Sequence, residues 1–362
     1  MERVARLTSL LEKRGLTHMV FAPGASFRYL TELDAHQSER LTLLGLDRNG
    51  KTALLLPQLE ASGAAGVNAG SICAYEDATG PREAVQEFAH SLGIREDSRV
   101  GVEAGQMRLF EADYLRELGC DLIPGDDVVM ALRVCKDEGE IRLLRAAARI
   151  VDDALASTIP LLRVGMSELE AAAELEYQMR RMGSAGVPFG TIVGSGPRGA
   201  LPHGGPTDRK IQQGELVVLD YGATRSGYAA DTTRTIAFGE PEAEARRVYE
   251  VVKKAQAAAV AAVGPGMGVA DVDRIARDMI AEAGYGEYFT HRTGHGLGLA
   301  VHEYPSIVQG SDVTLLPGMV FTIEPGVYLP ERFGVRIEDD VLVTENGATI
   351  LTQFTRELIV VV

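Results

Sequence analysis

The sequence predicts a two-domain protein that combines an α/β domain with an α+β domain. Its 362 residues exceed the size at which a single hydrophobic core usually keeps growing. Short apolar runs alternate with helical patterns up to about residue 130, whereas long helices and strand pairs follow. We therefore expect an N-terminal α/β domain over residues 1–132 and a second domain over residues 138–362.

The first domain is predicted from short, well-delimited segments. Charged and apolar residues alternate at helical spacing over residues 1–15, without the unbroken apolar region of a signal peptide. Asn49-Gly50 separates two apolar runs and indicates a β-hairpin. Residues 83–93 and 107–119 read as helices that end at glycine. No titratable cluster is evident, so this domain is expected to serve as a scaffold or lid.

Helix-start signals delimit the second domain. Asp137 with Glu140, and Ser167 with Glu170, have capping-box spacing. A third helix is expected over 241–263, with Pro241 as its first helical residue, and a fourth over 270–283.

The net charge and the cysteine content indicate which partners and which cellular compartment to expect. The sequence contains 36 Lys and Arg residues and 51 Asp and Glu residues, which gives a net charge of −15. We therefore expect neither nucleic acid nor a membrane surface as a partner. The three cysteines form no CxxC pair and indicate reduced thiols. We expect a cytoplasmic protein.

Four acidic residues interrupt apolar strand patterns in the second domain. Asp220 and Asp231 belong to one predicted strand pair, and Glu324 and Glu338 to another of similar pattern. Any one of them alone is more simply explained as a solvated strand end. All four, in two matching hairpins, would gather at one point, where bound cations or shared protons must compensate their charge.

His291 and His295 lie near the second strand pair in sequence. Their spacing would suit a metal-binding helix, but the glycines at 294, 296 and 298 favour a Gly-rich loop instead. A lone histidine is more often structural, yet beside four gathered acids a ligand role becomes the better interpretation.

Charge balance favours two divalent ions over one, because four carboxylates then sum to zero. Oxygen and imidazole ligands without thiolate favour Mn²⁺, with Co²⁺, Zn²⁺ or Fe²⁺ as alternatives. Two such ions about 3.5–4 Å apart would bridge a water and lower its pKa, which predicts hydrolysis.

Five ordered motifs closely resemble those of the pita-bread, or creatinase-fold, metallopeptidases, within their prolidase and aminopeptidase P branch: LDYGA, YAADTTRT, HRTGHGLGLAVHE, FTIEPGVY and VRIED. They span the second domain, and the chain is most like a bacterial or archaeal Xaa-Pro dipeptidase. SFRYLTEL is similar to the branch's Tyr-Leu-Thr-Gly element, with Glu32 where glycine is usual. The resemblance implies a creatinase-like first domain, serving as lid or for dimerisation, and a catalytic domain with a curved, mostly antiparallel sheet flanked by helices.

The resemblance also implies residue roles. Asp220 would bind one ion, Asp231 and Glu338 would bridge both, and His295 with Glu324 would complete the second ion's shell, with Glu324 as proton shuttle. His203 and His302 would stabilise the developing oxyanion and hold substrate. His291 would lie at the mouth of the site, and Tyr328 and Arg336 would support it. For His203, a local turn role remains an alternative, as does pairing of Arg336 with Asp340.

The resemblance implies hydrolysis of the Xaa-Pro bond of dipeptides, and it also implies a homodimer. Aminopeptidase P activity on longer peptides and a non-catalytic binding module are the alternatives. Asp339 and Asp340 are left outside the predicted metal shell.

Overall fold

The computed structural model describes residues 2–67 and 69–362, and the chain forms two compact units, Met1–Arg133 and Val134–Val362. The first unit contains α1 (Glu2–Arg14), β1 (His18–Phe21), α2 (Ala25–Thr31), β2 (Leu43–Asp47), β3 (Thr52–Pro57), η1 (Gln58–Glu60), β4 (Ser71–Tyr75), α3 (Arg82–Leu92), β5 (Arg99–Val102), α4 (Leu109–Arg116), β6 (Asp121–Pro124) and α5 (Asp126–Arg133).

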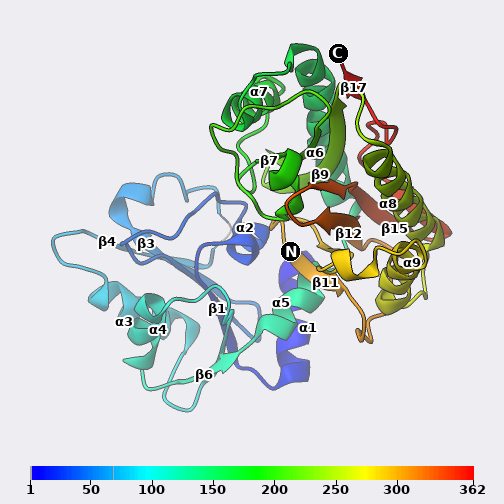
Figure 1. Ribbon diagram of the computed structural model, residues 1–362. Helices are drawn as coiled ribbons and strands as arrows, with labels where there is room; N and C mark the ends of the chain where they lie inside the picture. Colours follow the sequence, from blue (N-terminus) through cyan, green and yellow to red (C-terminus); the bar gives the residue numbers. More distant parts are fainter. Residues whose placement is uncertain (1, 68) are drawn as a thin grey trace. The chain divides into compact units, whose positions relative to one another are not determined.

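A six-stranded mixed sheet organises the first unit, in the order β4-β3-β2-β1-β5-β6 (Figure 1). The predicted hairpin around Asn49-Gly50 is confirmed, since β2 and β3 pair antiparallel across it. Helix α2 ends at Glu32, whose φ of 62° lies in the left-handed region that favours glycine. At the position where the resembling element usually has glycine, this chain therefore holds a glutamate in a left-handed conformation.

The second unit contains α6 (Glu138–Thr158), η2 (Ile159–Leu161), α7 (Glu168–Arg181), β7 (Ile192–Ser195), η3 (Gly196–Ala200), β8 (Leu216–Arg225), β9 (Tyr228–Phe238), α8 (Ala243–Ala262), α9 (Val269–Glu282), η4 (Gly286–Tyr288), β10 (Gly294–Gly296), β11 (Glu303–Ile307), β12 (Val320–Ile323), β13 (Gly326–Leu329), β14 (Phe333–Arg336), β15 (Asp339–Thr344), β16 (Gly347–Ile350) and β17 (Val360–Val361).

Three sheets form the second unit: β17-β9-β8-β7, β11-β10-β12-β15-β16 and the hairpin β13-β14. Buried residues of α6 and α7 pack with β8 and β9 in one core cluster, and those of α8 and α9 pack with β12 to β15 in another. Figure 1 shows α8 and α9 lying side by side. Each of the two strand pairs that carry the acidic residues is thus backed by a pair of helices.

The helix starts follow the predicted caps with one correction. Asp137 and Ser167 accept hydrogen bonds from the backbone N–H groups of Glu140 and Glu170, completing both capping boxes. The expected start of the third helix at Pro241 is wrong, because α8 begins at Ala243. Glu242, with φ −60° and ψ 155°, is extended and occupies the N-cap, so Pro241 precedes the helix.

Candidate metal centre

Asp220 and Asp231 lie on the same face of the long β8-β9 hairpin. Asp231 pairs with Gly222, and Asp220 pairs with Thr233 two rungs further along the ladder. Side chains directly opposite one another in an antiparallel pair share a face, and so do residues two apart on one strand. Strand geometry therefore turns both carboxylates toward the same space.

Glu324 and Glu338 flank the last rung of a second antiparallel ladder. Strand β12 ends at Ile323, which pairs with Asp339 at the start of β15. The hairpin β13-β14 forms the connection between the two glutamates. The backbone N–H of Glu338 donates to the carbonyl oxygen of Thr233 on β9 at 3.1 Å, which joins the two strand pairs beside the acids.

His295 lies on the short strand β10, where the sequence predicts a Gly-rich loop. Strand β10 fits tightly between β11 and β12. A Cβ atom at Gly294 would lie 1.8 Å from the carbonyl oxygen of Thr322, and one at Gly296 would lie 2.3 Å from that of Tyr304. The flanking glycines are therefore needed because neighbouring backbone approaches closely, and the loop expectation is corrected to a strand.

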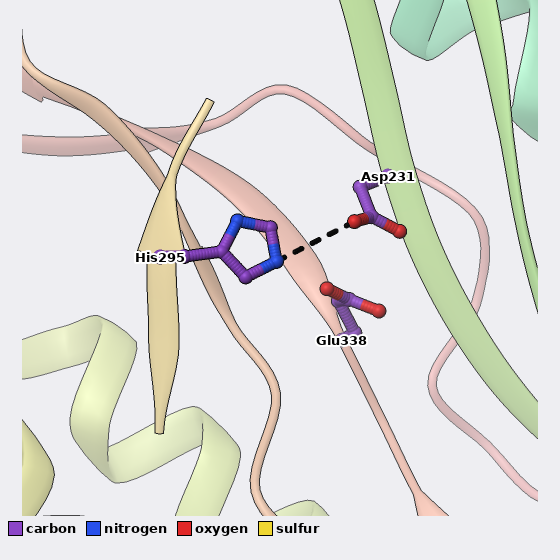
Figure 2. Close-up of side chains that lie close together, drawn as sticks. All are labelled: Asp231, His295 and Glu338. Carbon is purple, nitrogen blue, oxygen red and sulfur yellow. Dashed lines mark ion pairs between the residues drawn. The ribbon is translucent and has the colours of Figure 1, made fainter. Parts of the chain in front are cut away.

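Three of the predicted ligands meet in a buried cluster. Asp231, His295 and Glu338 each offer a ligand atom, and these atoms lie within 4.8 Å of one another. Figure 2 shows the three side chains turned toward a common point. Nε2 of His295 is 3.6 Å from Oδ2 of Asp231 and 3.4 Å from Oε1 of Glu324. Asp220 lies outside this trio, but it lines the same pocket.

The tautomer of His295 determines what its Nε2 can do. Nδ1 lies 3.1 Å from the carbonyl oxygen of Gly296, which can only accept, so Nδ1 carries the proton. Burial lowers the pKa of His295 to about 3, which keeps the ring neutral. The lone pair on Nε2 therefore faces carboxylate oxygens, an arrangement that a cation between them would make attractive.

Buried oxygens without partners support the same interpretation. Oδ1 of Asp220, Oδ1 of Asp231 and Oε1 of Glu338 have no hydrogen-bond partner among the described residues. Buried polar atoms are rarely left in this state. The donor set of carboxylate oxygens and one imidazole nitrogen therefore fits divalent metal ions.

Burial and mutual repulsion raise the pKa values of three of the acids. Burial, followed by repulsion from Glu338 and Asp220, raises the pKa of Asp231 well above its ordinary value. Burial likewise raises the pKa of Glu338 well above its usual range. Burial, opposed by the charge of Arg336, raises the pKa of Glu324 to about 7. Without a cation, the cluster would have to hold protons.

A hydrogen-bonded chain connects three further predicted residues. Arg336 donates from Nη2 to Oδ2 of Asp220 at 2.5 Å and from Nη1 to the Tyr328 hydroxyl at 2.7 Å. Nδ1 of His291 must donate to the carbonyl of Arg292, so its Nε2 accepts from the Tyr328 hydroxyl at 2.8 Å. The alternative pairing of Arg336 with Asp340 is therefore not the one the structure adopts.

Apart from Tyr328, the predicted site residues described above line one pocket of about 470 Å³ within the second unit. His203 and His302 also line it, and the rings of His302 and His295 meet edge to face with centroids 4.3 Å apart. Its apolar lining includes Phe189, Ile192 and Pro202. The arrangement can hold metal ions and admit a small molecule beside them.

Two family models match consecutive parts of the chain. The metallopeptidase family M24 model matches residues 142–345, and the creatinase/prolidase N-terminal domain model matches residues 3–135. The chain belongs to metallopeptidase family M24. Its second unit is accordingly the family's pita-bread domain, and its first unit has the creatinase N-terminal fold.

Relatives of this M24 metallopeptidase include named peptidases. An Xaa-Pro dipeptidase from Pyrococcus furiosus is 48% identical over 234 residues, covering 65% of this chain and 67% of the relative. The structure of a dipeptidase from Pyrococcus horikoshii OT3 superposes with a TM-score of 0.94 at 40% identity, over 99% of both chains. An X-Pro aminopeptidase structure from Thermotoga maritima MSB8 gives a TM-score of 0.87 at 34% identity, again over 99% of both chains.

Sequence reasoning missed two groups in the metallopeptidase site. Thr233 donates from Oγ1 to Oε2 of Glu338 at 2.6 Å and accepts from Nε of Arg336 at 3.0 Å. Strand alternation from Asp231 could have found it. Asp340, left outside the shell, accepts the backbone N–H of Asp231 at 3.2 Å, a contact that simple strand alternation does not predict.

Among residues 2–67 and 69–362, the structure contains no helix both long and apolar enough to cross a bilayer.

Proposed function

We propose that this metallopeptidase is an Xaa-Pro dipeptidase, which hydrolyses the peptide bond before proline in dipeptides. The observation that carries the proposal is a group of buried carboxylates that have unpartnered oxygens and that line one pocket together with His295, whose Nε2 is free to accept. Its similarity to a relative named Xaa-Pro dipeptidase supports the substrate class.

Two divalent ions, Mn²⁺ by preference, would be held by Asp220, Asp231, His295, Glu324 and Glu338. The number of ions rests on the five ligands that the family resemblance implies, because the charge of Arg336 has to be counted together with those of the four carboxylates. When bound, divalent ions polarise a carbonyl and lower the pKa of water toward neutrality. Arg336 orients Asp220 directly and Glu338 through Thr233.

The remaining side chains would handle substrate and protons. Glu324 is proposed as the proton shuttle, because its Oε1 lies 3.4 Å from Nε2 of His295 and so beside the proposed ions. His203 and His302 would donate to the carbonyl oxygen as negative charge develops. His291, Tyr328 and Arg336 would shape the mouth of the pocket through their hydrogen-bonded chain.

The apolar side of the pocket suits proline. Phe189, Ile192 and Pro202 offer aromatic and aliphatic surface on which a pyrrolidine ring could pack. This contact would favour proline over residues with longer or charged side chains at the position after the scissile bond.

Comparing substrates tests the assignment. The Mn²⁺-loaded protein should hydrolyse Ala-Pro with kcat/KM at least about tenfold higher than Ala-Ala, and also higher than the tripeptide Ala-Pro-Ala. Faster cleavage of Ala-Pro-Ala would instead assign aminopeptidase P activity, which the similarity to the Thermotoga maritima structure keeps in contention. No cleavage of any peptide after Mn²⁺ loading would favour a binding module.

Two broader proposals accompany this function. Cys73 and Cys120 are buried free thiols, which supports a reducing, cytoplasmic location. A homodimer, with the first unit serving as lid or dimer contact, remains our proposal from family resemblance. Size-exclusion chromatography with light scattering would decide the oligomeric state.

A further inference from the structure

Glu168 is a buried acid that the proposed chemistry does not use. It is the first residue of α7, and it is 0% exposed. A buried carboxylate is stable only when hydrogen bonds or a cation compensate its charge. The partners of Glu168 therefore show what this carboxylate does in the fold.

Five hydrogen bonds from three residues compensate this carboxylate. Oε1 accepts the backbone N–H of Ser195 at 2.9 Å and the hydroxyl of the same residue at 2.8 Å. Oε2 accepts the backbone N–H of Thr207 at 3.0 Å, the Thr207 hydroxyl at 2.7 Å and Nε of Arg198 at 2.9 Å. Burial by itself would raise the pKa of Glu168, but these donors outweigh it and lower the pKa below its usual value. The carboxylate is therefore ionised at neutral pH, and both of its oxygens are occupied.

The two oxygens of the carboxylate bind opposite ends of one loop, which comprises residues 196–206. Ser195 ends β7 just before this loop, and Thr207 follows the loop where the chain returns to the start of α7. Arg198 lies inside the loop, and its Nη2 also donates to the carbonyl oxygen of Gly205 at 2.5 Å. The carboxylate thus closes the loop at its base, and Arg198 extends the link across it.

The 196–206 loop carries part of the pocket wall. Pro202, His203 and Gly205 all line the pocket. His203 is exposed, and its ring forms no hydrogen bond with the rest of the described chain. Its place beside the pocket is therefore set by the backbone of its loop and by whatever holds that backbone.

Strand β7 connects the loop to the strands that carry metal ligands. Ser195 lies on the same strand as Ile192, which pairs with Asp220 on β8. Because Oε1 of Glu168 binds Ser195 and Oε2 binds the far end of the loop, one carboxylate fixes the loop relative to the β7-β8 pair. The distance between His203 and the proposed metal site therefore depends on this carboxylate.

We propose that Glu168 is a positioning residue, which holds His203 in the pocket by tying together the two ends of the 196–206 loop. This inference rests on the proposed function, in which His203 donates to the substrate carbonyl. Holding the imidazole in place before substrate binds leaves little freedom to be lost on binding. Glu168 itself does not line the pocket, so it acts only through the loop.

A double-mutant cycle isolates this role. In Glu168→Gln one carboxylate oxygen becomes an amide nitrogen, which cannot accept a hydrogen bond, so one end of the loop loses its partner. We expect kcat/KM for Ala-Pro to fall about 10- to 100-fold, with metal content unchanged. In a His203→Ala background the same substitution should lower kcat/KM by less than about threefold, because the histidine that it positions is absent.

Two further variants guard against a general loss of structure. Glu170→Gln makes the same change further along α7, at a side chain that is 55% exposed, and should lower kcat/KM by less than about twofold. Arg198→Gln breaks the link from inside the loop and should lower kcat/KM about 3- to 10-fold, a loss that should also vanish in the His203→Ala background. Since the Arg198 side chain is 27% exposed, this milder variant replaces Glu168→Gln if the latter fails to fold.

Hydrogen exchange tests the positioning role separately from the proposed function. Backbone amides of residues 195–207 should exchange about tenfold faster in Glu168→Gln than in the wild type, followed by mass spectrometry, whereas Glu170→Gln should leave them unchanged. Unchanged exchange in both Glu168→Gln and Arg198→Gln would overturn the positioning role, whatever the activity. Losses of kcat/KM that are equally large with and without His203 would overturn it as well. A wild type that cleaves no Xaa-Pro dipeptide, although its loop responds as expected, would refute the proposed function while the link between Glu168 and the loop stands.

Discussion

Arg336 is the residue that holds the side chains of the acidic cluster in place. One guanidinium, 3% exposed, binds Asp220 at 2.5 Å and reaches Glu338 through the hydroxyl of Thr233. A buried charge is stable only when it is paired and hydrogen-bonded. Arg336 thus offsets part of the negative charge and fixes the direction of two carboxylates.

Removing the Tyr328 hydroxyl tests this network. Tyr328→Phe leaves Nη1 of Arg336 and Nε2 of His291 without the oxygen that now lies 2.7 Å and 2.8 Å from them. We expect the free energy of unfolding to fall by about 2 kcal/mol, measured by urea denaturation of the metal-loaded protein. Tyr177→Phe, at a tyrosine that is 56% exposed, should change it by less than about 0.5 kcal/mol. Equal effects of both changes would contradict the role of the network.

Local patterns identified residue types here but not their partners. Acidic residues within apolar strands pointed to a cation site, because isolated buried charge is costly. Arg336 and Asp220, however, are 116 positions apart in sequence, and only the folded chain shows that they pair. The same holds for Arg292 and Ser306, whose contact depends on the β10-β11 register.

Strand β10 shows how an element positions a ligand. Its two glycines let β11 and β12 approach closely, so His295 projects from the middle of a sheet and not from a mobile loop. The sequence predicted the glycines' effect on helix formation correctly. Close approach of backbone, which involves Thr322 and Tyr304 from distant segments, is not encoded in local spacing.

A methyl group at Gly296 tests this arrangement. In Gly296→Ala the new Cβ would lie 2.3 Å from the carbonyl oxygen of Tyr304, so β10 and β11 must separate and His295 must move. We expect a loss of about 1–3 kcal/mol in stability together with reduced metal content, measured by calorimetry and elemental analysis. Gly186→Ala, where nothing lies within 4 Å of the new Cβ, is the matched control. Normal metal content in Gly296→Ala would refute the positioning role of β10.

Capping signals were the most reliable predictors of the helices. Both capping boxes act locally, within four residues, and both are present in the structure. Proline before α8 was less informative, because its fixed φ suits the residue before an N-cap as well as the first turn.

The second unit as a whole brings two helix-backed strand pairs together at a charged seam. The backbone hydrogen bond from Glu338 to Thr233 and the side-chain bond between Asp340 and the N–H of Asp231 cross this seam. Burial is the main cause that raises the pKa values of four acids there, which are Asp231, Glu324, Glu338 and Asp340. Stability of the unit should therefore depend on whether cations are present.

In the absence of cations, the stability of the unit should also depend on pH, and the sign of this dependence follows from the pKa shifts. A carboxyl such as Glu324, with a pKa of about 7 in the folded chain against about 4.3 unfolded, holds a proton that the unfolded chain has lost. The stabilising contribution of Glu324 to the free energy of unfolding is present at low pH and is lost as pH rises through 7. Histidines with lowered pKa values, such as His291 at about 4, act in the opposite sense, but their effect is complete by about pH 7.

Thermal unfolding should reveal this effect. In chelator, Tm should fall between about pH 7 and about pH 8.5, whereas with saturating Mn²⁺ it should change little, so the difference between the two curves widens. Scanning calorimetry at matched ionic strength provides the measurement. A chelated protein whose Tm rises over this range would show that the buried acids do not behave as described.

Metal analysis of Asp231→Asn tests the central claim most directly. The wild type, dialysed against Mn²⁺, should bind two ions per chain and hydrolyse Ala-Pro, while Asp231→Asn should lose bound metal and at least about 100-fold in kcat/KM. Asp153→Asn, an exposed acid of α6, should match the wild type. Full metal content with full activity in Asp231→Asn would contradict the account.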